Sequence, residues 1–294
     1  MPVVIDDLVM HDLEALTPLA PLHQPHNLAP IRALAAVHPH LPQVACFDTA
    51  FHRGHADVAT RFALPREFHD AGVRRYGFHG LSYEYIARRL KTVAPEIASG
   101  RVVVAHLGNG SSLCAIRNGR AAATTMGMTP LDGVPMGTRS GQIDPGVLFF
   151  LMKVKGMSVK EVSDLIHHNS GLKGLSGLSQ DMRVLEASDS PAAKEAIDYF
   201  VYRIRREIGS LAAALDGLDA IVFTGGIGEN SPRTRGEVLT GMEWLGVRLD
   251  KAANATNAQR ITTADSKTMA LVVKTNEERM IAEHAVNVAG LVAA

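Results

Sequence analysis

Residues 219–230, DAIVFTGGIGEN, decide the fold class, because an apolar strand pattern runs directly into a cluster of glycines. Glycine lets the backbone approach a ligand closely and adopt positive φ, and successive N–H groups in such a turn bind phosphate well. No Gly-Lys-Ser/Thr follows, so the stretch is not a Walker A loop, and it does not fit G-x-G-x-x-G. Taken alone, it is equally consistent with a phosphate-binding turn and with an ordinary strand-to-helix turn.

Outward from this stretch, strand and helix patterns alternate along the chain. We expect strands at 44–51, 101–125 (a hairpin that turns at Asn118-Gly119), 219–226 and 269–278. We expect helices at 31–41, 80–93, 144–156, 158–172 (stopping at Gly171), 190–215, 231–242 and 276–292. The basic run from Arg203 to Arg206 is expected on a solvated helix face. This order indicates an α/β chain.

Polar motifs lie where four of the expected strands end. They are Asp48, His106 to Gly110, Thr224-Gly225-Gly226 and Thr275-Asn276-Glu277. Ligands of α/β sheets bind beyond the carboxyl ends of the strands. The long loop 124–144 is rich in Gly, Pro and Met, and long ordered loops are often functional. The motifs together therefore predict a ligand site.

The residue types in these motifs suit phosphoryl transfer, which needs positioning and charge neutralisation more than covalent chemistry. The Gly-rich turns at 106–111 and 224–230 are suited to phosphate and nucleotide. Arg139, in the long loop, offers a fixed planar charge for an equatorial phosphoryl oxygen. His79 would donate a hydrogen bond to the same group.

Two acidic residues complete the set. Asp48 would orient a reactant or handle a proton, and Glu277 would hold Mg²⁺, which prefers oxygen ligands. Each residue also has a purely structural interpretation: Asp48 as a helix N-cap, Glu277 as an acid that complements a helix dipole, and Arg139 as a partner of Asp144. The prediction of function therefore depends on the occurrence of all these residues together and not on any one of them.

The composition limits the classes of binding partner and the cellular compartment that we expect for this protein. The chain has 294 residues, and its 30 basic and 30 acidic residues balance, so nothing points to nucleic acid or a membrane surface as the main partner. Cys46 and Cys114 have no CxxC spacing. We expect them to be buried free thiols in a protein of a reducing compartment. The start carries acids where a signal peptide carries Lys or Arg. These features predict a cytoplasmic protein.

Seven segments, in order and with similar spacing, resemble the acetate kinase (acetokinase) family. They are FDTAFH (47–52), YGFHG (76–80), HLGNGSS (106–112), MGTRSGQIDP (136–145), SGLSQDMR (176–183), FTGGIGEN (223–230) and TNEE (275–278). PLAPLHQPHNL (18–28) is also similar to a family segment. The resemblance covers nearly the whole chain. Within it, Tyr83 stands where the family has His, and Gln142 where it usually has Asp.

The resemblance implies the acetate and sugar kinase/Hsp70/actin (ASKHA, ribonuclease H-like) fold, with two related α/β domains. It implies a phosphotransferase with a carboxyl group as acceptor, which transfers a phosphoryl group reversibly from MgATP to acetate and gives acetyl phosphate and ADP. It implies Mg²⁺ (or Mn²⁺) as cofactor and a homodimer. A propionate or butyrate kinase is the alternative with the same chemistry.

The resemblance also implies a role for particular residues of this chain. The catalytic residues are Asp48, His79 and Arg139. The nucleotide-binding residues are His106, Leu107, Gly108, Asn109, Gly110, Asp181, Met182, Arg183, Gly225, Gly226, Ile227, Gly228, Glu229 and Asn230. Phe78 and Pro130 line the acyl pocket, and Glu277 is the metal ligand.

One departure concerns the family's N-terminal N-x-G-S-S-S-x-K segment, which this sequence does not contain. We therefore expect a truncated first domain, with 1–47 as its remnant, 48–274 as the second, nucleotide-binding domain, and 275–294 as a C-terminal helix that returns to the first. A catalytically impaired nucleotide-binding fragment is the second alternative.

Overall fold

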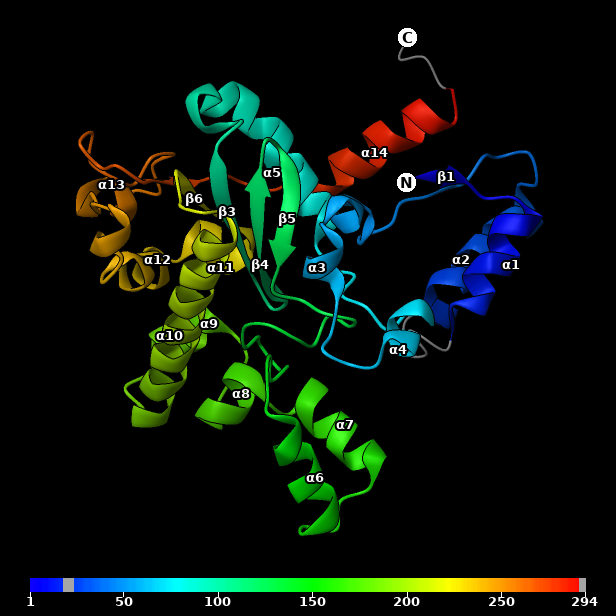
Figure 1. The fold of residues 1–294 in the computed structure, drawn as a ribbon, viewed down its shortest axis with the longest axis horizontal. Helices are drawn as coiled ribbons and strands as arrows, with labels where there is room; N and C mark the ends of the chain where they lie inside the picture. Colours follow the sequence, from blue (N-terminus) through cyan, green and yellow to red (C-terminus); the bar gives the residue numbers. More distant parts are fainter. Residues whose placement is uncertain (18–23, 291–294) are drawn as a thin grey trace.

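A five-stranded mixed sheet forms the centre of the molecule in a computed structural model, which describes residues 1–17 and 24–290 (Figure 1). The strand order is β5-β4-β3-β6-β7. The strands are β3 (Arg101–Leu107), β4 (Ser111–Arg117), β5 (Arg120–Thr124), β6 (Ala220–Thr224) and β7 (Met269–Val272). The expected PLAPLHQPHNL similarity falls partly on residues 18–23, outside the described residues, as does the end of the expected C-terminal helix.

The sheet combines an antiparallel hairpin with parallel strands. β3 pairs antiparallel with β4 and β4 with β5, whereas β6 pairs parallel with β3 and with β7. The hairpin turns at Asn118 and Gly119, whose φ angles are 54° and 71°, as a two-residue turn with positive φ at both positions requires. The expected hairpin is confirmed, and the strand expected at 269–278 ends at Val272.

Helices cover both faces of the sheet, and others lie away from it. They are α1 (Asp7–Ala15), α2 (Gln24–Val37), α3 (Asp57–Thr60), α4 (Arg66–Asp70), α5 (Gly80–Val93), α6 (Pro145–Lys153), α7 (Val159–His168), α8 (Gly171–Ser176), α9 (Met182–Glu186), α10 (Pro191–Ala214), α11 (Gly225–Asn230), α12 (Pro232–Leu239), α13 (Lys251–Ala255) and α14 (Glu277–Val288), with 3₁₀ turns η2 (Ala50–Gly54), η3 (Pro95–Ile97) and η4 (Glu243–Leu245).

The core has two halves because β3 is buried on both faces, as a central strand should be. Val103, Ala105 and Leu107 face a cluster built on α10. Val102 and Val104 face the opposite cluster, which includes residues of α5. The sheet is therefore held between α5 and α10, and its strand ends stay fixed relative to both helices.

Three expected elements differ from the structure. The strand expected at 44–51 is limited to β2 (Val44–Ala45), because the chain then turns into η2. The helix expected at 158–172 ends at His168, and Gly171, with φ of 60°, begins α8 instead of ending α7. The helix expected at 31–41 is α2, which begins earlier and contains Pro30.

The two ends of the described chain contact the body of the protein differently. β2 pairs with β1 (Val3–Val4) in a small sheet of its own, and α1 and α2 lie to one side of the central sheet (Figure 1). α14 packs on α5, where His284 Nε2 lies 2.9 Å from Glu84 and Arg88 pairs with Glu283. None of the helices in the described ranges is long and apolar enough to cross a membrane.

Candidate active site

Two glycine-rich turns lie side by side where β3 and β6 end. His106 of β3 pairs with Thr224 of β6, so both strands reach the same edge. A Cβ placed on Gly225, whose φ is 78°, would lie 2.8 Å from the Leu107 carbonyl oxygen, and one on Gly108 would lie 3.8 Å from the Gly226 nitrogen. The approach of Gly225 to β3 requires glycine, whereas the contact at Gly108 is an ordinary van der Waals distance.

The second turn continues as the short helix α11. Its Glu229 carboxylate accepts hydrogen bonds from Thr224 Oγ1 (3.2 Å), the Gly225 nitrogen (2.9 Å) and the Thr275 nitrogen (3.0 Å). Asn230 Nδ2 donates to the Gly226 carbonyl oxygen (2.9 Å). Glu229 thus joins the end of β6 to the segment that follows β7. Its carboxylate holds the backbone of the turn in place.

Asp48 caps α5 across a gap of more than 30 residues in sequence. Its carboxylate accepts from the nitrogens of His79 (2.8 Å) and Leu81 (3.4 Å), and its carbonyl accepts from the Gly80 nitrogen (2.8 Å). His79 has φ of 57° and ψ of 27°, the left-handed region that few non-glycine residues adopt. Asp48 is therefore not the N-cap residue of a helix that follows it, because His79 is the N-cap of α5; its carboxylate instead reaches the α5 N-terminus from a distant segment and fixes the backbone of His79.

The His79 ring lies between His106 and the turn at Gly110. The two imidazoles stack with centroids 4.3 Å apart and planes 22° apart. A Cβ placed on Gly110 would lie 3.3 Å from His79 Nε2 and 3.7 Å from Arg139 Nη1. Burial, followed by the charge of Arg139, lowers the pKa of His79 to about 4, so the ring is neutral at pH 7.

Arg139 reaches the same point from the long loop. Its Nη1 donates to the Pro130 carbonyl oxygen (3.1 Å), and burial lowers its pKa. The loop docks on the first glycine turn, where the Gly137 nitrogen donates to the Asn109 carbonyl oxygen (3.0 Å). Asp144 instead caps α6 through the Gly146 nitrogen. The structure therefore brings His79, Arg139 and the first glycine turn together.

Two buried arginines hold this arrangement, and the sequence reasoning missed both. Arg203 was expected on a solvated face, but it is 5% exposed and donates to Gln142 Oε1 (2.8 Å), at the base of the Arg139 loop. Arg235, fully buried, donates to the carbonyl oxygens of Gly228 and Glu229. The available signal was that Arg203 follows the apolar Ala196 and Phe200 by seven and three residues, which places all three on one helix face.

The segment 181–183 lies on the surface beside the second turn. Asp181 caps α9 and pairs with the exposed Arg183 guanidinium at 2.6 Å. Met182 is 3% exposed and belongs to the core.

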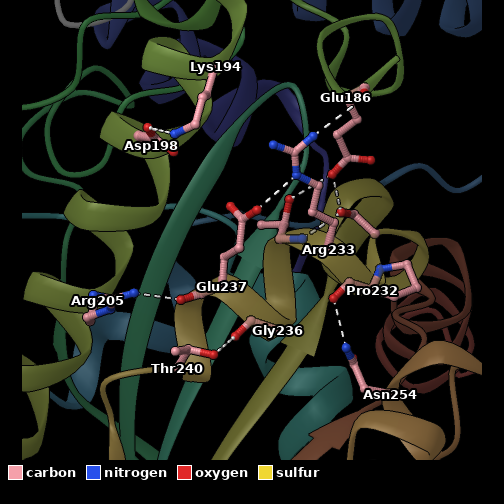
Figure 2. Close-up of polar contacts among 12 residues, drawn as sticks. Glu186, Lys194, Asp198, Arg205, Pro232, Arg233, Gly236, Glu237, Thr240 and Asn254 are labelled. Carbon is pink, nitrogen blue, oxygen red and sulfur yellow. Dashed lines mark hydrogen bonds and ion pairs between the residues drawn. The ribbon is translucent and has the colours of Figure 1, made fainter. Parts of the chain in front are cut away.

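The helices around the second turn are joined to one another. Glu186 accepts from Ser231 Oγ (2.5 Å), the N-cap of α12, and its carbonyl from Arg233. Figure 2 shows Glu186 beside Arg233 and the contact from Asn254 to Pro232, which ties α12 to α13. These contacts hold α9, α12 and α13 around the end of α11.

Glu277, the first residue of α14, and Asp48 form an acidic pair whose chemistry suits Mg²⁺. Burial, and then the charge of Asp48, raise the pKa of Glu277, so two carboxylates share a partly buried region. Across residues 1–17 and 24–290, no cluster of three or more His, Cys, Asp or Glu would hold a metal ion. Mg²⁺ needs only one or two carboxylates when waters and substrate phosphates supply the rest. The donors present fit a Mg²⁺ ion that arrives with a nucleotide.

The residues expected to line an acyl pocket lie beside His79 and Arg139. Pro130 holds Arg139 through its carbonyl, and the carbonyl of Phe78 lies 3.0 Å from His52 Nε2. A cavity of about 440 Å³ is lined by Phe47 and Thr49, the neighbours of Asp48, and by N-terminal residues. Another of about 350 Å³ lies between α10 and α12 and shares no residue with this site.

The fold matches those of solved carboxylate kinases. The crystal structure of Porphyromonas gingivalis acetate kinase aligns with a TM-score of 0.92 and 41% identity, over 98% of this chain and 74% of that one. A propionate kinase from Francisella tularensis aligns with a TM-score of 0.90 and 38% identity, over 96% and 74%. The ASKHA fold class expected from the sequence is thereby confirmed, and these two similar proteins are carboxylate phosphotransferases.

Sequence comparison names the family. The model of the acetokinase family matches residues 1–283. The acetate kinase of Methylocella silvestris is 62% identical over 283 residues, 96% of this chain and 70% of the relative, and that of Nitrobacter hamburgensis is 59% identical over the same shares. The chain belongs to the acetokinase family.

Proposed function

We propose that this chain transfers a phosphoryl group between MgATP and acetate, giving acetyl phosphate and ADP. The observation that carries the proposal is the convergence of His79 Nε2 and Arg139 Nη1 on the Gly110 turn. Two hydrogen-bond donors that meet at one point suit the equatorial oxygens of a phosphoryl group in flight. Family membership and acetate kinase relatives at up to 62% identity support the same reaction.

In this mechanism the residues of the chain position the reactants and neutralise the charge of the phosphoryl group. Arg139 contributes a fixed positive charge, and His79 contributes a neutral N–H donor. Asp48, held by the α5 N-terminus, keeps His79 in place and is proposed to orient a reactant or to handle a proton. Fixed donors of this kind stabilise charge that develops in the transition state, because they need no reorganisation at the moment of reaction.

We propose that the nucleotide lies along the paired glycine turns. The nucleotide-binding residues are proposed to be His106, Leu107, Gly108, Asn109 and Gly110 on one side and Gly225 to Asn230 on the other, with Asn109 and Gly226 exposed in the two turns. No heavy atom lies within 4 Å of a Cβ placed on Gly226, which leaves its backbone open to a ligand. Asp181, the Met182 backbone and Arg183 are proposed to contact the nucleoside end.

Glu277 is proposed to hold Mg²⁺ (or Mn²⁺). The raised pKa of this carboxyl, caused by burial and by Asp48, marks a region that a cation would stabilise. A bound Mg²⁺ would neutralise phosphate charge.

The acyl specificity is proposed to favour acetate, with propionate as the second candidate. The similarity to a solved propionate kinase keeps the second candidate in view. A difference of one methylene changes binding by only ~1–3 kcal/mol, and Phe78 and Pro130 are the proposed wall. Rates of ADP release with acetate, propionate and butyrate test this order; a higher kcat/KM for propionate would reverse it.

A homodimer in the cytoplasm is proposed as the working form. Free thiols at Cys46 and Cys114 fit a reducing compartment. The exposed apolar residues Phe149 and Phe150 of α6 and Tyr202 of α10 offer surface that a second copy would cover. Light scattering of the purified chain tests the dimer, and a monomer at micromolar concentration would rule it out.

A further inference from the structure

Two buried hydroxyl groups lie at the Nδ1 edge of the His79 ring, whereas Nε2 faces Gly110. Ser112, on β4, places its Oγ 2.7 Å from His79 Nδ1. Tyr83, on α5, places its hydroxyl 2.5 Å from the same Ser112 Oγ. Both residues are fully buried, so water does not compete for these hydrogen bonds.

The number of protons available fixes which group donates in each hydrogen bond of the series from Tyr83 through Ser112 to His79. Burial raises the pKa of Tyr83 well above its ordinary value, so its hydroxyl keeps its proton, and Ser112 is its partner among the described residues. If Tyr83 donates to Ser112, then Ser112 donates to His79 Nδ1 and every proton has an acceptor. In the reverse order the buried Tyr83 proton would have none, and an unmet buried donor is costly.

We propose that Tyr83 and Ser112 are positioning residues that hold His79 as the tautomer protonated on Nε2, so that its N–H faces the Gly110 turn beside Arg139. The hydrogen bond at one ring nitrogen sets the protonation of the other. His106, stacked on His79 and held through Nδ1 by Ser82 (2.8 Å), keeps the ring plane fixed. The importance of this tautomer for turnover rests on the proposed function.

The tautomer is measured directly by ¹⁵N NMR of the imidazoles in the labelled, nucleotide-free chain at pH 7, with the His79 signals assigned from their loss in His79→Gln. We expect an unprotonated Nδ1 and a protonated Nε2. In Ser112→Ala and in Tyr83→Phe we expect the signals to move toward a mixture of tautomers. Tyr76→Phe is the matched control, because it removes a hydroxyl that donates to the Gly72 carbonyl (2.7 Å) and touches neither Ser112 nor His79.

The possible outcomes distinguish a failure of the tautomer assignment from a failure of the proposed reaction. A protonated Nδ1 in the wild type, or unchanged signals in both variants, would overturn the role of Tyr83 and Ser112 even if the chain is active. In an active chain, Tyr83→Phe should lower kcat by roughly two- to tenfold and leave the KM for ATP unchanged within about twofold, as expected for a group that acts in the transition state. An inactive wild type with the expected tautomer would contradict the reaction and leave the tautomer assignment standing.

Discussion

His79 stacks on His106, with ring centroids 4.3 Å apart and ring planes 22° apart. Two imidazoles in this arrangement must both stay neutral, because a proton on either ring would be buried beside the other, and one on His79 would also lie beside Arg139. Burial is the first cause that lowers the pKa of His79 to about 4 and that of His106 to about 3. The stack therefore makes the site sensitive to acid.

The fold should lose stability as the pH falls from about 6.5 toward 4. The unfolded chain binds protons on these histidines near pH ~6.5, whereas the folded chain does not bind them until a lower pH. His55, with a pKa of about 4 caused mainly by burial, adds to the effect. The stability is fully present above pH ~6.5, and each such histidine contributes a slope of up to about 1.4 kcal/mol per pH unit in this window.

Urea unfolding between pH 4 and pH 8 measures this slope. His106→Gln, which does not titrate, should unfold with a shallower dependence on pH than the wild type. A stability that stays constant from pH 7 to pH 5 in the wild type would contradict the burial of neutral imidazoles.

Arg139→Ala should lower kcat far more than it raises the KM for ATP. Its guanidinium faces the Gly110 turn, where charge develops only during transfer, and removal of one such donor costs roughly 10²–10³ in kcat. Arg248→Ala is the matched control, because Arg248 is exposed and pairs with Asp265 on the surface. Equal losses in kcat and in ATP affinity would count against a role in the transition state.

Gly226→Val should weaken ATP binding without unfolding the protein. Within residues 1–17 and 24–290, no heavy atom lies within 4 Å of a Cβ at this position, and Gly226 does not have positive φ, so we expect the added side chain to meet the ligand and not the protein. Isothermal titration should show a loss of at least about tenfold in ATP affinity, that is about 1.4 kcal/mol. Gly54→Val, at another open position, should bind ATP like the wild type; an unchanged affinity in Gly226→Val would remove the nucleotide from this turn.

Arg235→Ala should destabilise the fold by about 3 kcal/mol or more, because several buried carbonyl oxygens lose their donor. The oxygens of Gly228, Glu229 and Asn254 all accept from Arg235. Arg233→Ala, two residues away, loses mainly an exposed pair with Glu237 (Figure 2) and should cost less than about 1 kcal/mol. Similar denaturant midpoints for the two variants would contradict a structural role for Arg235.

The sequence was sufficient for the order of the central strands and the helices that cover them, and its site stays a prediction. Alternating apolar runs gave the hairpin and the parallel strands, and the glycines at the ends of β3 and β6 marked the edge where Gly108 and Gly226 meet. The strand at 44–51 was overestimated because its apolar residues are also those of a 3₁₀ turn. Periodicity describes which residues are buried, and it does not distinguish two short elements with the same burial.

The contacts that orient the site depend on tertiary structure. Asp48 reaches the α5 N-terminus from a distant segment, and Arg203 reaches Gln142 from α10. Neither partner is apparent in a single sequence, because the residues are separated by tens of positions and no local pattern joins them. Arg203 was expected in solvent because charged residues are rarely buried unless they are paired; in the structure it pairs with Glu207, four residues on along α10, at 3.8 Å, as well as with the uncharged Gln142.

Acetyl phosphate formation by the purified chain with MgATP and acetate, measured beside Arg139→Ala, tests the central claim most directly. The account predicts that acetyl phosphate accumulates with the wild type and falls by roughly 10²-fold or more with the variant. A folded wild-type chain that binds ATP and forms no acetyl phosphate, or a variant as active as the wild type, would contradict it.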